Sequence, residues 1–432
     1  MINQKTKESL MNQDVRIGYA CLNPDISQGF KTCRFDNLTN DKWIELIEWN
    51  LATLEEMITY TVDHGIGLLR LSSDLIPFAT KPKEGVDLDW KEYFESTFHR
   101  IKDKVQSTQL RISMHPGQYT VLNSMDMNVV QRAIDDLEYH SELLELLGGN
   151  QTNKIIIHIG GVYGDKEAAM ARFIDQANQL SKRVRGHLVI ENDERLYSIH
   201  DVLSISEQTG LPVIFDNLHH EVRRPDDPTP MAEYIKVAGQ TFKKADGRQK
   251  IHYSQQAPVK KAGAHSQTIA IQPFIAFLKQ LPDMYPLDIM LEVKDKNRST
   301  EKIQVYLDQD VAAAEKLWAK RKYSVLAKSA GIYQKIRDVL KDKQHVDFLL
   351  FIQLLEEAEV TSENVGAEVN AAQHIWGYFN KQATSKETAT YQKNIARYQA
   401  NEITSRQLRQ FFKRLLKKYP NDYLEKSLYF NE

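Results

Sequence analysis

Eight short apolar, β-rich runs recur along the chain, with helix-like stretches between them. The runs begin at Arg16, Gly67, Leu110, Lys154, His187, Leu211, Lys250 and Asp288. Such alternation is typical of parallel strands joined by crossover helices. Eight strands in one series predict an α/β fold, a closed (β/α)8 TIM barrel rather than an open sheet.

The segments between the runs carry signals for helix starts and ends. Asn40 and Asp41 are expected to cap a helix, and Gly65 follows its expected end. Asp165 and Ser198 precede two further amphipathic stretches. These signals support the interpretation of each run and its following helix as one barrel unit.

The length of 432 residues favours a barrel with a smaller appendage. After the eighth run the apolar residues recur with continuous helical periodicity, which predicts a C-terminal all-α extension. TSENVG, from Thr361, is interpreted as a linker. We therefore expect a polar N-terminal tail over 1–14, a barrel over 15–310, a helical segment packed on or following the barrel over 311–360, and a helical domain over 367–432.

Composition excludes several classes of protein. Hydrophobic residues make up 42% and charged residues 26%, which argues against wholesale disorder. The net charge of -2 provides no overall positive field, so any nucleic-acid surface must be local. Two cysteines, Cys21 and Cys33, and a polar opening predict a reducing cytoplasm, and no apolar run reaches the roughly 18 residues of a membrane span.

Potential metal ligands stand at the ends of successive predicted strands. The carboxyl ends of all strands meet at one face of a barrel, so these side chains are expected to converge. The set consists of His115, His158, Glu191, Asp216, His219, His252, His265 and Glu292.

A single histidine or acid at such a position is usually structural. Five imidazoles and three carboxylates together would be costly to desolvate without cations. Mixed ligands of this kind suit Mn, Zn or Fe better than Mg or Ca. Eight ligands exceed the need of one ion, so two or three ions bridged by Glu191 or Glu292 are expected, an arrangement typical of phosphodiester hydrolysis.

Lys250 lies on the seventh predicted strand, two residues before His252. An ammonium among divalent cations would be repelled and would tend to lose its proton. It could then be carbamylated and act as a ligand, which we treat as a hypothesis; alternatively it faces the neighbouring layer and reaches solvent.

Five other histidines are interpreted as structural, and a sixth is left open. His220 neighbours His219 and is left open, because it would point elsewhere in an extended segment. The structural histidines on predicted helices are His64, His99, His140 and His200, and His187 is placed at the start of a strand.

Nine segments spread over every barrel unit resemble the UV damage endonuclease family. They are GYACLNP from Gly18, RLSSDLIPF from Arg70, HPGQYTVLNS from His115, HIGGVYGDKEAA from His158, IENDER from Ile190, FDNLHH from Phe215, KIHYSQQ from Lys250, GAHS from Gly263 and DIMLEVKDKN from Asp288. The likeness extends from Val15 to Asp342, and the combination of HPGQY, IENDE and LEVKDK is specific.

The resemblance implies a barrel related to endonuclease IV, a cluster of divalent ions with manganese usual and Zn2+ as the alternative, and hydrolysis of the phosphodiester immediately 5′ to ultraviolet photoproducts. It implies double-stranded damaged DNA as the partner and the bacterial cytosol or nucleoid as the location. By matching position, the eight residues above are the metal ligands. The predicted catalytic residues are Glu191, Lys250, His115 and His158.

The resemblance also assigns residues to DNA. Gln118 and Tyr119 match a pair that probes the damaged duplex, and Tyr19 and Asn23 match residues lining the lesion pocket. Many relatives carry a histidine shortly after SSDLIPF, where this chain has Lys81, so that position is left out of the site. Basic residues after the fifth to eighth strands are expected to face passing phosphates: Arg195, Arg223, Arg224, Lys260, Lys261, Lys294 and Lys296.

The C-terminal block resembles a bacterial domain of unknown function, which implies no chemistry. Protein partners are unknown and could bind there. Trp376, Tyr378 and Phe379 are expected in its core. One helix is basic and is interpreted as a solvated face rather than a DNA contact, through Arg406, Arg409, Lys413, Arg414, Lys417 and Lys418.

Three other functions remain open from the sequence. A metal-dependent sugar isomerase also places His, Glu and Asp at barrel strand ends, although the ligand count and the HPGQY loop disfavour it. An abasic-site endonuclease of the endonuclease IV type would perform the same reaction on a different lesion. A binding protein that has lost activity would lack ligands, yet all eight are present.

Overall fold

The computed structural model describes residues 14–26, 28–281 and 285–430. Two compact units are distinguished, Met1–Glu301 and Lys302–Glu432, called here the barrel unit and the helical unit. The tail expected over residues 1–14 lies, except for Asp14, outside the described residues.

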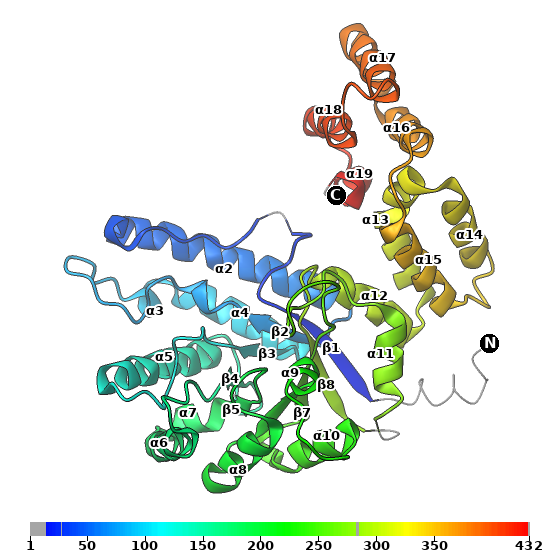
Figure 1. The fold of residues 1–432 in the computed structure, drawn as a ribbon. Coiled ribbons are helices and arrows are strands. Elements are labelled where there is room, and N and C mark those ends of the chain that lie inside the picture. Colours follow the sequence, from blue (N-terminus) through cyan, green and yellow to red (C-terminus); the bar gives the residue numbers. More distant parts are fainter. Residues whose placement is uncertain (1–13, 27, 282–284, 431–432) are drawn as a thin grey trace. The chain divides into compact units, whose positions relative to one another are not determined.

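Eight parallel strands close into a barrel in chain order, as predicted. The ring closes where β1 pairs with β8, with Val15 opposite Leu287 and Tyr19 opposite Leu291. Figure 1 shows the strands at the centre of the barrel unit with helices around them. The strands are β1 (Val15–Ala20), β2 (Leu68–Leu71), β3 (Arg111–Met114), β4 (Ile155–Ile157), β5 (Leu188–Glu191), β6 (Val213–Asp216), β7 (Gln249–Tyr253) and β8 (Leu287–Leu291).

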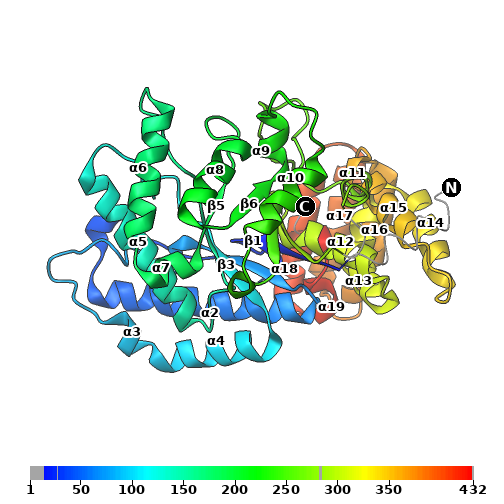
Figure 2. The ribbon, with the colours of Figure 1, turned by 90° about the horizontal axis from the view of Figure 1, so that it is seen from below.

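Helices follow the strands and cover the outside of the barrel, which Figure 2 shows from a second direction. They are α2 (Asn40–Asp63), α3 (Trp90–Tyr93), α4 (Glu95–Thr108), α5 (Met127–Leu146), α6 (Lys166–Gln179), α7 (Lys182–His187), α8 (Ile199–Thr209), α9 (Asn217–Val222), α10 (Met231–Gln240) and α11 (Ile271–Leu278), while α12 (Asn297–Asp308) spans the division between the units.

Helix caps explain most of the predicted boundaries and correct two. Asp165 and Ser198 cap α6 and α8 as expected. The cap of α2 is Thr39, whose side chain accepts a hydrogen bond from the Lys42 amide. The prediction that Asn40 and Asp41 cap this helix was therefore wrong, because the cap lies one residue before Asn40. His187 ends α7 rather than starting β5, and its Nδ1 lies 2.7 Å from the Asn153 carbonyl oxygen.

Charged side chains occupy the barrel interior below the carboxyl ends of the strands. Arg111 on β3 donates to Asp288 on β8 over 2.7 Å, and Arg16 donates to the same carboxylate over 2.7 and 2.8 Å. Lys154, immediately before β4, is fully buried and ion-paired with Asp246 at 2.5 Å. Because buried charges are tolerated only when paired, this network fixes the layer on which the site rests.

The helical unit has its own apolar core, and the predicted C-terminal all-α region is confirmed. Phe379 is buried and Trp376 stacks on Tyr391 with ring centroids 4.3 Å apart, as expected for core residues. Its helices are α13 (Val311–Lys328), α14 (Ala330–Lys341), α15 (Phe348–Val360), α16 (Val365–Phe379), α17 (Ser385–Gln399), α18 (Ser405–Lys418) and α19 (Asp422–Glu425).

Arg409 departs from the expectation of a uniformly solvated basic helix. It is 6% exposed, and its guanidinium donates to the Glu368 carboxylate over 2.9 and 3.2 Å. The Tyr429 hydroxyl donates to the same carboxylate over 2.6 Å. Sequence spacing alone could not place Arg409 on the buried face of α18, because Glu368 comes from a different helix.

Within the described residues, none of the helices has both the length and the apolar character needed to cross a membrane.

The buried Glu368 and Arg409 pair predicts a large effect on stability. Glu368→Ala is expected to lower the free energy of unfolding by about 3–5 kcal/mol, because a guanidinium would stay buried without this carboxylate. Urea unfolding followed by tryptophan fluorescence would measure it. Glu315→Ala is the control: Glu315 pairs with Lys343 at side-chain exposures of 46% and 64%, so a loss under about 1 kcal/mol is expected. Equal losses would contradict the prediction.

Candidate metal centre

All eight predicted ligands lie at or beyond the carboxyl end of a strand. His115, His158 and Glu292 directly follow β3, β4 and β8, and Glu191 and Asp216 end β5 and β6. The last three are His219 on α9, His252 on β7 and His265 in the loop after β7. Barrel closure therefore brings them to one end of the molecule, although 177 positions separate His115 from Glu292 in the sequence.

Glu191 lies at the centre of this cluster, only 1% exposed. One carboxylate oxygen, Oε2, lies 3.2 Å from Nε2 of His115 and 3.7 Å from Nε2 of His158. The other, Oε1, lies 2.6 Å from Nδ1 of His252 and 4.0 Å from Nδ1 of His219. One carboxylate thus contacts imidazoles from both sides of the barrel.

Glu292 forms a second centre beside Glu191. Its Oε1 lies 3.2 Å from Nδ1 of His252, and its Oε2 lies 3.9 Å from Nδ1 of His265. Arg70, on β2, forms an ion pair with Glu292 that sequence reasoning missed. The signal available in the sequence was an arginine inside an otherwise apolar strand.

The carboxylates differ in their proton affinity. Burial alone would raise the pKa of Glu191, but His252 and the hydrogen bond from His115 hold it well below its ordinary value. The pKa of Glu292 is lowered against burial by Arg70 and His252. Burial raises the pKa of Asp216 to about 6, with Glu191 and Glu292 adding to the effect and His219 opposing it.

The imidazoles differ in the same way. Burial lowers the pKa of His158 and of His265. Burial would also lower the pKa of His219, but Asp216 and Glu191 raise it to about 9. The raised pKa of His219 favours its protonated form at neutral pH, which would partly offset the charge of the two nearby carboxylates.

The unpartnered atoms of the cluster fit divalent cations. In the described part of the chain, Nδ1 of His158, Nε2 of His252 and Oδ2 of Asp216 are buried without a hydrogen-bond partner, whereas buried polar atoms are normally paired. Two groups have ligand atoms within 4.8 Å of one another: His115, His158 and Glu191, and Glu191, Asp216 and His252. Glu191 belongs to both groups, so it would contribute a ligand atom to a cation in either one.

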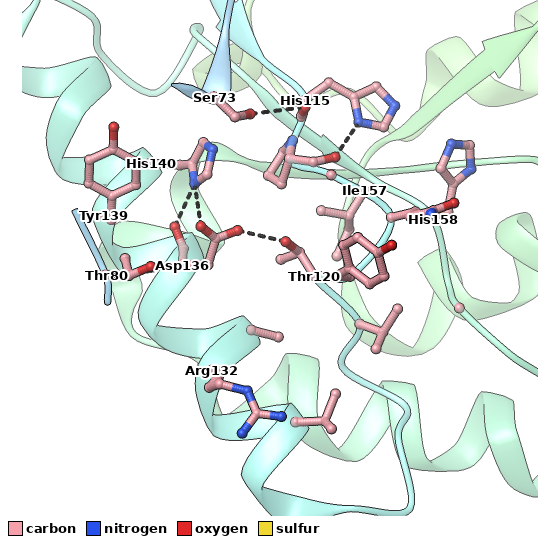
Figure 3. Close-up of a pocket in the computed structure, with 18 of the residues that line it drawn as sticks. Ser73, Thr80, His115, Thr120, Arg132, Asp136, Tyr139, His140, Ile157 and His158 are labelled. Carbon is pink, nitrogen blue, oxygen red and sulfur yellow. Dashed lines mark hydrogen bonds and ion pairs between the residues drawn. The ribbon is translucent and has the colours of Figure 1, made fainter. Parts of the chain in front are cut away.

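A cavity of about 1170 Å³ opens beside His115 and His158. Gln118, Tyr119 and Arg195 are among the predicted DNA-contacting residues that line it, and Tyr119 is 83% exposed. Figure 3 shows Thr120 and Asp136 pointing toward one another in this cavity, and the Thr120 hydroxyl donates to Asp136 over 2.6 Å. This bond ties the HPGQY loop to α5.

The family model described as UV-endonuclease UvdE matches residues 15–317. The chain belongs to the UV-endonuclease UvdE family. The resemblance seen in the sequence is thereby confirmed. A UV DNA damage endonuclease of Clostridium perfringens is 39% identical over 292 residues, covering 67% of this chain and 69% of that protein. Another of Bacillus cereus is 32% identical over 260 residues, covering 60% and 80%.

Solved structures and a second family model extend the comparison. The crystal structure of SacUVDE superposes with a TM-score of 0.64 at 36% identity, over 68% of this chain and 98% of that one. Residues 322–432 match a protein family of unknown function, DUF1722. The domain boundaries expected from the sequence stay predictions.

Lys250 lies one layer deeper than the cluster around Glu191. It is fully buried on β7 opposite Asp288 of β8, and within the described residues its Nζ has no hydrogen-bond partner. Burial, with Arg111 and Arg70 nearby, lowers the pKa of its ammonium well below the ordinary value. The alternative of a side chain that reaches solvent was therefore wrong.

Several predicted DNA-contacting residues are not brought to the cavity. Tyr19 is fully buried and hydrogen-bonded to Thr61 and Asn23, over 2.7 and 3.1 Å. Burial raises the pKa of Tyr19 to about 12. Tyr19 and Asn23 therefore face the core between β1 and α2 rather than the cavity. Their assignment to the lesion pocket stays a prediction.

Other predicted positions lie elsewhere on the catalytic-end loops. Arg223 and Arg224 follow α9, and Lys260 and Lys261 lie in the loop after β7, outside the lining of this cavity. Lys294 and Lys296 follow β8. The ammonium nitrogen of Lys81 lies 3.9 Å from the ring centroid of Phe35.

His220, which the sequence left open, lies on α9. The segment is helical rather than extended, and His220 is buried with its ring 5.1 Å from that of Phe215 and 5.0 Å from that of Tyr234.

Metal affinity is expected to rise with pH across two steps. Asp216 is protonated at a pH below its pKa of about 6, and His219 is protonated at a pH below its pKa of about 9. Each group must lose this proton before it can bind a cation. Calorimetric titration of chelator-treated protein with Mn2+ would show affinity falling as pH decreases. His219→Ala should remove the upper step, while His99→Ala, at an exposed histidine on α4, should leave it unchanged. An affinity independent of pH would contradict these assignments.

Proposed function

We propose that this chain hydrolyses the phosphodiester immediately 5′ to ultraviolet photoproducts in double-stranded DNA. The observation that carries the proposal is the convergence of five histidines and three carboxylates at one end of the barrel, where Glu191 lies within 4.0 Å of four of the histidines. Membership of the UV-endonuclease UvdE family and the names of its relatives support it.

The eight residues of the cluster would hold two or three divalent cations, with Mn2+ as the proposed native ion and Zn2+ as the alternative. Bound ions of this kind supply Lewis-acid stabilisation of the phosphoryl oxygens and a nucleophile at neutral pH. Glu191 would bridge neighbouring cations, since its two oxygens face different imidazoles. Arg70 keeps Glu292 ionised and in place.

Lesion selection is assigned to the loop after β3. Photoproducts weaken stacking, so extruding the damaged nucleotides costs less than the few kcal/mol usual for intact duplex. Gln118 and the exposed ring of Tyr119 stand at the cavity edge, where they would fill the gap left in the duplex. The bond from Thr120 to Asp136 would hold this loop while it probes the duplex.

Phosphates would be neutralised by basic residues of the catalytic-end loops. Arg195 lines the cavity and is 69% exposed at its side chain, so it is available to a passing strand. Arg223, Lys260 and Lys261 are proposed to act further along the duplex. A location in the bacterial cytosol or nucleoid, and protein partners of the helical unit, remain predictions from the sequence.

The proposal is tested with supercoiled plasmid. With Mn2+, the protein is expected to nick ultraviolet-irradiated plasmid and to leave untreated plasmid intact. Glu191→Gln should reduce nicking to background because the neutral amide cannot bridge cations, while the melting temperature stays close to that of the parent protein. Retained nicking by Glu191→Gln would remove Glu191 from the catalytic set.

The same assay separates the alternative functions. Nicking confined to plasmid with abasic sites would replace the proposal with an abasic-site endonuclease. No nicking of any damaged plasmid, with Mn2+ binding intact, would point to a sugar isomerase or a binding role. Exposed Glu45→Gln on α2, at a residue that pairs with its helix neighbour Lys42, serves as the matched control for Glu191→Gln.

Lys250 is proposed to carry a carbamate. A neutral amine adds to the carbon of CO2 and releases one proton, and the resulting anion would face Arg70 and Arg111 in place of a repelled cation. Native mass spectrometry at neutral pH should show the mass of one CO2 on the parent protein and none on Lys250→Met. Full activity with an unmodified mass would contradict it.

A further inference from the structure

The loop after β4 holds a tyrosine in a backbone conformation that disfavours it. Tyr163 has a φ of 50°, in the left-handed region, within the stretch from Gly160 to Gly164. Bulky residues rarely adopt this region, whereas glycine does so freely. Strained residues of this kind gather at functional sites.

The same strain recurs at the catalytic end of the barrel. Among described non-glycine residues with positive φ, five follow a barrel strand: Cys21, Phe78, Tyr163, Val259 and Lys296. Of these five, Tyr163 and Phe78 line the cavity beside the metal ligands. Tyr163 is 43% exposed there, and Phe78 packs against Phe35 with ring centroids 5.3 Å apart.

Neighbouring loops fix the backbone under Tyr163. The Asn123 side-chain amide donates to the Gly161 carbonyl over 2.7 Å, and the Tyr197 hydroxyl donates to the same oxygen over 3.0 Å. A Cβ atom at Gly160 would lie 2.4 Å from Asn123 Oδ1, so Gly160 is needed for this approach. The loop is therefore rigid where it presents the ring.

The ring is supported from behind and remains accessible. It lies against Gly161, where an added Cβ atom would approach Cε2 of Tyr163 to 3.1 Å. The Arg172 guanidinium lies 5.4 Å from the ring centroid, and its Nε donates to the Asn123 carbonyl over 3.1 Å. A rigid, partly exposed aromatic ring in a cavity that also contains His158 and Tyr119 has the properties of a stacking platform.

We propose that Tyr163 contacts the DNA substrate directly, by stacking on a nucleobase that enters the cavity opposite Tyr119. This inference rests on the proposed function. In this arrangement Tyr119 acts from the loop after β3 and Tyr163 from the loop after β4. Arg172 is a positioning residue, because it holds the ring and reaches the loop after β3 through Asn123.

The test compares single-turnover nicking of irradiated plasmid by Mn2+-loaded variants over a range of protein concentrations. Tyr163→Ala should raise the half-saturating concentration on the order of tenfold, since stacking contributes about 1–3 kcal/mol per base. The maximal rate should change little, because the metal ligands are untouched. Tyr163→Phe keeps the ring and should behave as the parent protein.

Two controls distinguish stacking from a structural role. Tyr93→Ala removes a 57%-exposed tyrosine outside the cavity lining and should leave the half-saturating concentration unchanged. Tyr163→Gly relieves the backbone strain, so its melting temperature should equal or exceed that of Tyr163→Ala while DNA binding stays weak.

The inference is overturned if Tyr163→Ala saturates at the parent concentration. It is also overturned if Tyr163→Phe raises the half-saturating concentration as much as Tyr163→Ala does. A third contradicting result is a Tyr163→Gly protein that binds DNA weakly and also melts at a lower temperature than Tyr163→Ala. If the parent protein failed to nick irradiated plasmid, the proposed function itself would be rejected. That outcome is distinct from any difference between the variants.

Discussion

A buried carboxylate among imidazoles is the constraint on which the catalytic end depends. Glu191 ends β5 and lies within 4.0 Å of nitrogen atoms from four histidines, each supplied by a different strand or its following segment. An anion excluded from water is tolerated only where opposite charge or donors surround it. The cluster meets this requirement incompletely, since atoms of His158, His252 and Asp216 lack partners within the described residues. Cations would complete it.

The barrel beneath the cluster is organised to hold that charge. Arg70 pairs with Glu292 at the level of the site, while Arg16 and Arg111 share Asp288 one layer below. Lys250 lies in this lower layer, in register with Asp288, and its lowered pKa follows from burial next to these guanidinium groups. The electrostatics of the site therefore extend beyond the ligands, into a layer whose residues come from the amino-terminal halves of the strands.

The loops around the cavity show how rigidity and recognition are combined. Asn123 hydrogen-bonds the loop after β4, and Thr120 hydrogen-bonds Asp136 on α5, so the HPGQY and HIGGVYG segments support one another. Preorganised side chains lose less freedom when a ligand binds, which favours selection by the deformability of DNA rather than by base sequence. The left-handed backbone of Tyr163 is compatible with this arrangement only because its neighbours fix it.

The sequence by itself determined the barrel, because apolar runs and helix caps are local signals: all eight strands lie where the periodicity placed them. It also determined which residues gather at the catalytic end, since in a closed parallel barrel every strand end meets at one face. Tertiary structure alone decided the pairing of Arg70 with Glu292, the depth of Lys250, the burial of Tyr19 and Asn23, and the buried place of Arg409. Each of these depends on contacts between elements distant in the chain, and neither residue type nor spacing encodes which partner a side chain will meet.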